Sequence, residues 1–293
     1  MSQKELKLGI PKGSLQEATV QIFEKAGFRL SCSSRSYFPS IDDVEIKPVL
    51  IRAQEMARYV EEGILDCGIT GNDWVLENGS KVDRLATLEY SKATSNPVRW
   101  VVAVDNDSPY KSIKDLKGKR ISTELVGATK RFFKKNGIPV KVEFSWGATE
   151  VKVKADLADA IVELTETGSS LKANNLRIID TVCESKTQFI ANKTAAKDSW
   201  KRKKMDYITM LLGGAIEARD KVGVKLNVQE KNLEKVIGVL PALRKPTISH
   251  LIDKGWFALE FIAEEREIKS LIAKLKEFGA EGIVEYPLNK IIH

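Results

Sequence analysis

The sequence predicts an α/β fold of two lobes, followed by a smaller α+β domain. Up to Asn192, short apolar strands alternate with amphipathic helices, which is typical of a mostly parallel sheet covered by helices. The alternation restarts after Asn96-Pro97, and this restart indicates a second lobe. From Val224 the order becomes strand, helix, strand, strand, helix, strand, which is the order of a ferredoxin-like domain.

The first lobe is expected to begin with a buried strand at Leu6 to Ile10 and a helix behind it. Ser14 and Glu17 form a capping box, which stabilises a helix start because each side chain pairs with a backbone N–H group. Gly27 ends this helix. The same order is expected twice more, with strands at Val44 to Ile51 and Leu65 to Thr70 and helices at Ala53 to Glu62 and after Asn72-Asp73.

The second lobe repeats this pattern, and a long helix at Met205 to Asp220 follows it. Its expected strands are Arg99 to Val104, Arg120 to Thr123, Val140 to Phe144 and Thr187 to Asn192, with a helix at Gly127 to Asn136. We therefore predict three domains. The first lobe takes residues 1–94 and 193–218, the second lobe takes residues 95–192, and the C-terminal domain takes residues 219–293.

The composition argues against several classes of protein. The chain is 43% hydrophobic and 30% charged, which is ordinary for a globular protein. No apolar run approaches the roughly 20 residues that span a bilayer, and no export signal is seen, so we expect a cytoplasmic protein with no membrane partner. The three scattered cysteines fit a reducing compartment, and the two histidines argue against a His-based triad or general base.

The net charge of +7 has two explanations. It can reflect a solvated basic surface, or it can serve an anionic partner. Proteins that bind single-stranded nucleic acid usually interleave aromatic with basic residues, and that pattern is absent here. We therefore expect small phosphorylated ligands and no nucleic acid.

The most informative stretch runs from Ala158 to Leu171. An apolar strand leads into a loop of hydroxyl side chains around one glycine, and a following helix would present free backbone N–H groups to a phosphate. Acidic residues just before the loop suit ribose hydroxyls or a magnesium ion carried by pyrophosphate. A capped helix start in a surface turn would give the same sequence, because short Gly/Ser loops often resemble phosphate-binding loops by chance.

Other candidates lie at strand-to-helix junctions, where ligands of open α/β sheets collect. Lys12 follows the first strand and could meet a phosphate, or it could be a solvent-exposed turn lysine. Arg52 and Arg99 lie at strand margins, where an arginine contacts phosphate or forms a surface ion pair. Trp146 to Glu150 is either a packed tryptophan with a polar turn or a segment in which Glu150 orients a nucleotide or a metal-bound water.

Taken together, these motifs resemble the ATP phosphoribosyltransferases of the long, histidine-regulated form. The resemblance begins at Asp159 to Leu171, which is similar to the family's phosphoribosyl pyrophosphate loop. It extends over nearly the whole chain through Leu8 to Gly13, Asp66 to Asp73, Ser145 to Glu150, Ala173 to Arg177, Leu240 to Leu243, Lys245 to Thr247 and Lys274 to Ile283. Ser170 stands where a threonine is commoner in the family, and the hydroxyl is kept.

The resemblance implies a catalytic part similar to type II periplasmic-binding proteins, with two lobes around a cleft. It also implies transfer of phosphoribose from phosphoribosyl pyrophosphate to N1 of ATP, with Mg²⁺. Glu166, Thr167, Gly168, Ser169 and Ser170 would then cradle the 5′-phosphate, and Asp159 and Glu163 would lie near the ribose. Further cleft residues implied in this way are Lys12, Gly13, Arg52, Gly71, Asp73, Arg99 and Glu150.

The resemblance further implies that the C-terminal domain binds histidine as an inhibitor. The candidate ligands are Asn227, Leu243, Thr247 and Gly282. The family often has an acidic residue at the position of Asn227, so the amide keeps an acceptor for the histidine ammonium but loses a charge. Dimers that assemble into hexamers are also implied.

Three rival functions stay open on the residues themselves. A two-lobed small-molecule-binding protein without catalysis has the same architecture, but it would not need the ferredoxin-like tail. A nucleic-acid-binding protein rests on charge alone, and its binding would weaken steeply with salt. A catalytically silent relative is disfavoured by the intact run Thr167-Gly168-Ser169-Ser170.

Overall fold

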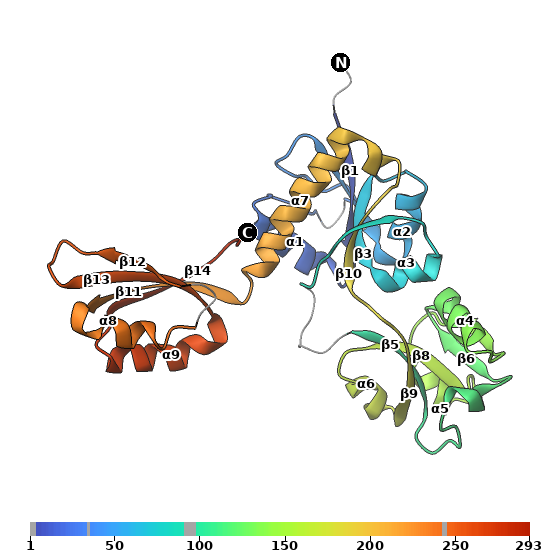
Figure 1. Cartoon of the computed structure of the whole chain (residues 1–293). Coiled ribbons are helices and arrows are strands. Elements are labelled where there is room, and N and C mark those ends of the chain that lie inside the picture. The colour runs from blue at the N-terminus through green and yellow to red at the C-terminus, as the bar shows by residue number, and fades with distance from the viewer. Residues whose placement is uncertain (1–3, 34–35, 91–97, 242–244) are drawn as a thin grey trace. The chain divides into compact units, whose positions relative to one another are not determined.

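The computed structural model describes residues 4–33, 36–90, 98–241 and 245–293. These residues form two compact units. One contains the chain up to Glu24 together with Phe28–Thr209, and the other contains Lys25–Gly27 together with Met210–His293. Each unit has its own sheets and core, as Figure 1 shows along the chain.

The first unit contains two five-stranded sheets, and the first of them begins at the N-terminus. Its strand order is β2-β1-β3-β10-β4. β1 pairs in parallel with β2 and β3, whereas β10 runs antiparallel to β3 and β4. The strands are β1 (Leu6–Lys12), β2 (Ile46–Arg52), β3 (Cys67–Gly71), β4 (Asp83–Thr87) and β10 (Thr187–Ala191).

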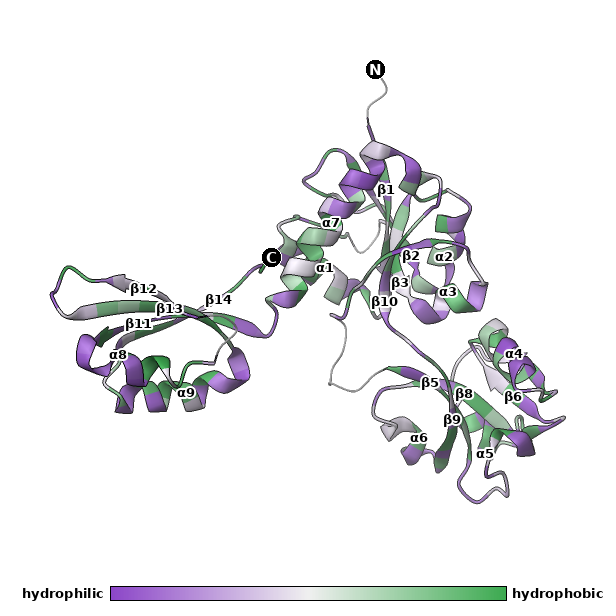
Figure 2. Ribbon diagram, viewed as in Figure 1, coloured by the Kyte–Doolittle hydropathy of each residue, from purple (hydrophilic) through white to green (hydrophobic). Residues whose placement is uncertain are grey.

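Helices cover both faces of this first sheet (Figure 1). α2 contributes the buried side chains Met56, Ala57 and Val60, whose spacing places them on one face of the helix. Figure 2 shows the hydrophobic residues along β1 and β3, which are buried in the middle of the sheet. The helices are α1 (Gln16–Ala26), α2 (Ala53–Glu61), α3 (Asn72–Asn78) and α7 (Ser199–Glu217), with a 3-10 turn at Ala195–Lys197.

The second sheet has the strand order β7-β6-β8-β5-β9. β6 is parallel to β7 and β8, so the carboxyl ends of these three strands meet at one edge. β5 is antiparallel to β8 and β9. The strands are β5 (Arg99–Asp105), β6 (Arg120–Thr123), β7 (Lys141–Phe144), β8 (Ala160–Thr165) and β9 (Leu176–Glu184). The helices are α4 (Val126–Lys135), α5 (Val151–Lys154) and α6 (Ser169–Ala173), with a 3-10 turn at Ile113–Leu116.

Two features differ from the predicted domain limits. β10 lies in the first sheet, so the stretch 95–192 does not form one lobe, because its last strand pairs with β3 and β4. An apolar strand next to a lobe boundary has no local signal that tells which sheet it will join. The second compact unit also takes the chain from Met210, within α7, and not from residue 219.

The second unit contains the predicted ferredoxin-like domain, and its topology confirms that part of the fold. The sheet order β12-β13-β11-β14 places the first and third strands of the motif at its centre. All described pairs in this sheet are antiparallel. The elements are β11 (Lys221–Gln229), α8 (Glu230–Ile237), β12 (Thr247–His250), β13 (Trp256–Glu264), α9 (Glu265–Glu277) and β14 (Glu281–Pro287).

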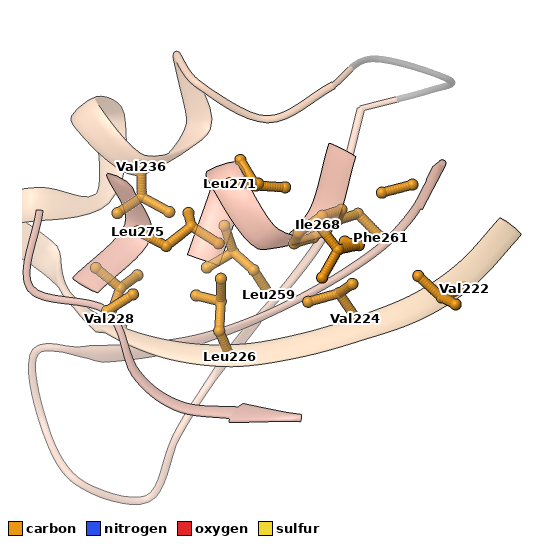
Figure 3. Close-up of a cluster of buried hydrophobic side chains, with 12 residues drawn as sticks. Val222, Val224, Leu226, Val228, Val236, Leu259, Phe261, Ile268, Leu271 and Leu275 are labelled. Carbon is orange, nitrogen blue, oxygen red and sulfur yellow. The ribbon is translucent and has the colours of Figure 1, made fainter. Parts of the chain in front are cut away.

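Alternation along β11 explains how this domain closes its core. Val222, Val224, Leu226 and Val228 point to the two helices, because successive strand residues face opposite sides of a sheet. Figure 3 shows these side chains packed against residues of α8, β13 and α9, among them Val236, Leu259, Phe261, Ile268, Leu271 and Leu275. Lys225, Asn227 and Glu260 lie on the opposite face of the sheet.

Candidate active site

A cavity of about 490 Å³ lies where strands of both sheets of the first unit end. Lys12, Arg52 and Gly71 are the last residues of β1, β2 and β3, and all three line it. Parallel strands place such ends at the same edge of a sheet, which is where ligands bind in open α/β folds. Six of the predicted site residues line this cavity, namely Lys12, Gly13, Arg52, Gly71, Asp73 and Glu163.

Lys12 and Arg52 form the basic part of the cavity. They are register partners across the parallel pair β1–β2, so the two cationic side chains leave neighbouring strand ends. The Lys12 Nζ atom lies 3.6 Å from the centroid of the Tyr37 ring. Hydrogen bonding from Lys12 and its charge lower the pKa of the Tyr37 hydroxyl. The arrangement gathers positive charge where a phosphorylated ligand could bind.

Gly71 and Asp73 form a buried acceptor beside the basic residues. Asp73 is only 3% exposed, and its Oδ2 accepts a 2.7 Å hydrogen bond from Nε1 of Trp100. Its Oδ1 is buried and has no hydrogen-bond partner among the described residues. A side chain at position 71 would overlap this Oδ1, so the close approach requires glycine. A buried unpaired carboxylate oxygen is costly, and a ligand donor would relieve that cost.

Acidic residues of the second sheet face the same region. Glu124 follows β6, Glu150 lies beyond the end of β7, and Glu163 lies near the end of β8. Burial raises the pKa of the Glu163 carboxyl, and the charges of Glu150 and Glu124 raise it further. Hydrogen bonds from the Leu164 backbone and the Thr149 hydroxyl oppose this rise. The charges of Glu150 and Glu124 therefore disfavour the charged form of Glu163 near the carboxyl end of β8.

Replacing Glu163 with glutamine is expected to stabilise the fold at pH 8. Folding raises the pKa of this carboxyl, so the charged form is disfavoured in the folded state, and this cost disappears as pH falls toward the ordinary value of 4.5. We expect the melting temperature to rise by roughly 2 °C at pH 8 and by less at pH 5. Calorimetry at both values measures this, with exposed Glu143→Gln as the control. A gain that ignores pH would contradict the explanation.

The predicted phosphate loop joins β8 to α6. Gly168 has a left-handed backbone with φ 77°, and its N–H donates to the Thr165 hydroxyl at 2.8 Å. The Thr167 hydroxyl donates to Ser169 Oγ at 3.0 Å. The side chains of Thr167, Ser169 and Ser170 are exposed, and none of the residues 166–170 lines the described cavity. The loop begins at Glu166, two residues after Leu164, and Leu164 does line the cavity.

Arg99 belongs beside this loop and not in the cavity wall. It is the register partner of Thr165 across the antiparallel pair β5–β8, so both side chains leave the sheet on the same face. Its neighbour Trp100 lines the cavity on the other face. The Nε atom of Arg99 is buried and has no hydrogen-bond partner among the described residues.

Asp159 does not join the other predicted site residues. It precedes β8, whereas the phosphate loop follows β8, and the six residues of the strand separate them by roughly 20 Å. Its Oδ2 accepts from the backbone N–H of Arg120 at 2.8 Å and pairs with Arg120 Nε at 3.4 Å. The prediction that Asp159 lies near the ribose is therefore corrected, because the carboxylate holds the amino ends of β6 and β8 together.

Trp74, Trp100 and Glu124 are among the cavity residues that were not predicted from the sequence. Trp74 and Trp100 line the cavity, and their rings meet edge to face with centroids 6.0 Å apart. Glu124 lines it too, directly after β6. Its place at a strand-to-helix junction was a usable signal, whereas nothing local distinguishes a cavity tryptophan from a core one. Trp146, for which packing was one prediction, is 92% exposed.

The described residues contain no group of three or more His, Cys, Asp or Glu side chains that could hold a metal ion. Among the described helices, none is both long and apolar enough to cross a membrane.

In the second unit, three of the four predicted histidine ligands, Asn227, Thr247 and Gly282, lie on the sheet away from the face that packs on the helices. A side chain at Gly282 would come within 3.3 Å of Asn227 Nδ2, so these two positions adjoin across β11 and β14. Thr247 pairs with Glu260 on β13, and β13 separates it from β11. Leu243 lies outside the described residues.

Comparison with known proteins identifies the family. Residues 52–218 match the family model described as ATP phosphoribosyltransferase, and residues 218–290 match the one described as HisG, C-terminal domain. An ATP phosphoribosyltransferase of Solibacter usitatus is 60% identical over 98% of this chain and 99% of its own length. One from Thermodesulfovibrio yellowstonii is 58% identical over the full length of both chains.

A solved structure agrees with these relatives. The ATP phosphoribosyl transferase (HisG:HisZ) complex from Thermotoga maritima contains a chain that is 29% identical to this one. It superposes with a TM-score of 0.62 over 72% of this chain and 98% of that chain. The chain belongs to the ATP phosphoribosyltransferase family.

Proposed function

We propose that the cavity at the strand ends is where N1 of ATP meets C1 of phosphoribosyl pyrophosphate. As a member of its family, the chain is an enzyme that transfers the phosphoribosyl group to N1 of ATP and releases pyrophosphate, the first step of histidine biosynthesis. One observation supports the placement most. Lys12 and Arg52 from the first sheet and Glu163 and Glu124 from the second line the same cavity.

The charges in the cavity suit this reaction. The leaving pyrophosphate gains negative charge as its bond to C1 breaks, and Lys12 and Arg52 would neutralise it. C1 becomes oxocarbenium-like, and the carboxylate of Glu163 would stabilise that positive charge. Glu150, which interacts with Glu163, would help to orient the nucleotide. Mg²⁺, bound by pyrophosphate oxygens, would supply further charge neutralisation.

Asp73 would bind the ATP base and not the pyrophosphate. Its unpaired Oδ1 is an acceptor, and pyrophosphate offers no N–H to donate. The adenine amino group does offer one, and it adjoins N1. Gly71 permits the approach of this oxygen, and Gly13, whose φ is 110°, turns the chain beside Lys12. The protein thus acts by positioning, which explains how the reaction proceeds without a histidine base.

The loop Glu166 to Ser170 would cradle the 5′-phosphate. Gly168 already has the left-handed backbone that exposes neighbouring amides and hydroxyls. The buried, unpaired Nε atom of Arg99 supports the same placement, because a guanidinium suits phosphate oxygens.

Pyrophosphate release tests the catalytic and regulatory proposals together. The full chain is incubated with ATP, phosphoribosyl pyrophosphate and Mg²⁺, with and without histidine. Release that requires both substrates and falls with histidine is the expected result. Release that ignores histidine would remove the regulatory proposal and leave the catalytic one. If the folded protein releases no pyrophosphate under any condition, the result would favour a two-lobed small-molecule-binding protein without catalysis.

Feedback inhibition by histidine at the C-terminal sheet is part of the same proposal. Asn227, Gly282 and Thr247 would contribute to that site, together with Leu243. Asn227 and Gly282 adjoin, which suits a small ligand. We also propose a cytoplasmic homo-oligomer that forms dimers and, with histidine, hexamers. The described cysteines are all free, which fits a reducing compartment.

Replacing Asn227 with aspartate is expected to strengthen inhibition by histidine. A carboxylate would add a charge-assisted hydrogen bond to the histidine ammonium, so the half-inhibiting concentration should fall roughly fivefold. Inhibition curves measure this, and Asn232→Asp on α8 is the matched control. Unchanged or weaker inhibition in Asn227→Asp would place the ammonium elsewhere.

A further inference from the structure

Helix α3 joins the two sheets of the first unit. It follows β3 of the first sheet, yet its side chains Trp74 and Leu76 pack against the hydrophobic core of the second sheet. At its start, Asp73 accepts the hydrogen bond from Trp100 on β5. The first turn of α3 is therefore part of the cavity and of the contact between the two lobes.

The other end of α3 meets the beginning of α4 through a carboxylate. The Glu77 Oε1 atom accepts from the Gly127 N–H at 2.8 Å, and its Oε2 accepts from the Ala128 N–H at 2.8 Å. A carboxylate at a helix N-terminus gains both hydrogen bonds and a favourable interaction with the helix dipole. The two bonds fix the orientation of α4 relative to α3, because they use both oxygens.

Arg131 completes the contact in the opposite direction. Its guanidinium donates from α4 to the backbone carbonyls of Leu76 and Glu77, at the C-terminal end of α3. A cation is favourable there, since those carbonyls carry the negative end of the helix dipole. Each helix thus supplies a charged side chain to the end of the other.

Gly127 allows the two helices to approach this closely. A Cβ atom at this position would lie 2.7 Å from the backbone carbonyl oxygen of Glu77, which is closer than such atoms pack. Any larger residue would push the ends of α3 and α4 apart. The contact therefore depends on one glycine and two charged side chains from different lobes.

We propose that this α3–α4 contact is an interlobe latch and that Glu77 is a positioning residue for the reaction. The latch is rigidly connected to the cavity on both sides. Asp73 and Trp74 line the cavity at the start of α3, and Glu124 lines it two residues before α4 begins. Holding the helix ends together therefore holds the first lobe's cations and the second lobe's carboxylates at a fixed separation.

Loss of the latch should weaken substrate binding more than chemistry. Where β9 leads toward β10, the Ser185 N–H donates a 2.7 Å hydrogen bond to the Val98 carbonyl, just before β5 begins. Without the latch, the two lobes would adopt several arrangements, and only one of them would bind both substrates. If it falls to about a fifth of the population, the KM of both substrates rises roughly fivefold while kcat changes little. This inference rests on the proposed placement of the substrates in the cavity.

The test compares Glu77→Ala, Glu77→Gln and Gly127→Ala in the full chain. Steady-state kinetics should show a several-fold rise in KM for both substrates in Glu77→Ala and Gly127→Ala. Partial recovery is expected in Glu77→Gln, which keeps one acceptor oxygen. Hydrogen exchange of the Gly127 and Ala128 amides should speed up in Glu77→Ala. The control is Glu61→Ala, because Glu61 accepts from the Lys81 N–H at 2.9 Å within the first lobe alone.

Several outcomes would overturn the latch. If the amides at the start of α4 exchange faster in Glu77→Ala but both KM values stay the same, the contact is purely structural. A lower KM would show that the contact holds a non-binding arrangement. An equal KM rise in Glu61→Ala would trace the effect to general loss of stability. Arg52→Ala tests the proposed active site separately. If the substrates do not bind in this cavity, Arg52→Ala would leave kcat and KM unchanged.

Discussion

Replacing Arg52 with alanine is expected to lower kcat/KM roughly 100- to 1000-fold. Arg52 ends β2, lies in register with Lys12, and lines the cavity with an exposed side chain. It would neutralise charge that develops on the leaving pyrophosphate, so its loss should act on the transition state and reduce kcat. The side chain packs against little, and the fold should keep its melting temperature. Initial rates at varied substrate concentrations measure the effect.

Two variants show whether the Arg52 effect is electrostatic. Arg52→Lys keeps the charge but not the forked geometry, and it should fall between the wild type and Arg52→Ala. Lys47→Ala removes an exposed cation from the same strand, five residues away toward the opposite end of the sheet, and should change nothing. If Lys47→Ala and Arg52→Ala lower kcat/KM equally, the effect comes from the net charge of the protein and not from the position of Arg52.

Replacing Asp73 with asparagine is expected to lower kcat/KM by roughly 100-fold or more without unfolding the protein. The amide oxygen can keep the bond to Trp100, and the amide nitrogen then takes the place of the unpaired Oδ1. A donor would then face a donor of the adenine base. Asp73→Ala should in addition lose about 1–3 kcal/mol of stability, because the buried Trp100 N–H loses its partner.

Asp66→Asn is the matched control for Asp73. Asp66 is 7% exposed in the same part of the fold, and its carboxylate accepts from the Lys7 backbone at 2.8 Å and from Lys201 at 2.6 Å. Because Asp66 does not line the cavity, its amide variant should melt at a lower temperature and keep its kcat/KM. If Asp73→Asn behaves in this way too, Asp73 is structural and does not bind ATP.

Local patterns in the sequence predicted most elements because their signals are short-range. The predicted capping pattern of Ser14 and Glu17 and the glycine at position 27 both lie within a few residues of the first helix, which begins at Gln16. The βαββαβ order of the C-terminal domain follows from apolar alternation such as that of β11. Junctions between strand and helix also pointed to Lys12, Arg52 and Gly71, which do line the cavity.

Long-range pairing could not be predicted in the same way. β10 joins the first sheet although β9, the strand before it, belongs to the second, since strand pairing depends on contacts far apart in the chain. Asp159 lies a strand's length from the loop it was grouped with, because residues close in sequence can occupy opposite ends of an extended strand. Trp74 and Trp100 were missed because nothing local distinguishes a cavity tryptophan from a core one.

The sequence by itself determined the family, the order of elements and the strand ends that carry charge, because these depend on local spacing and on motifs read together. Tertiary structure decided which of those ends share a cavity. It placed Trp100 against Asp73, gathered Glu124 and Glu163 from different strands, and brought Glu77 to the start of α4. Such contacts join residues tens of positions apart, and only the folding of both lobes brings them together.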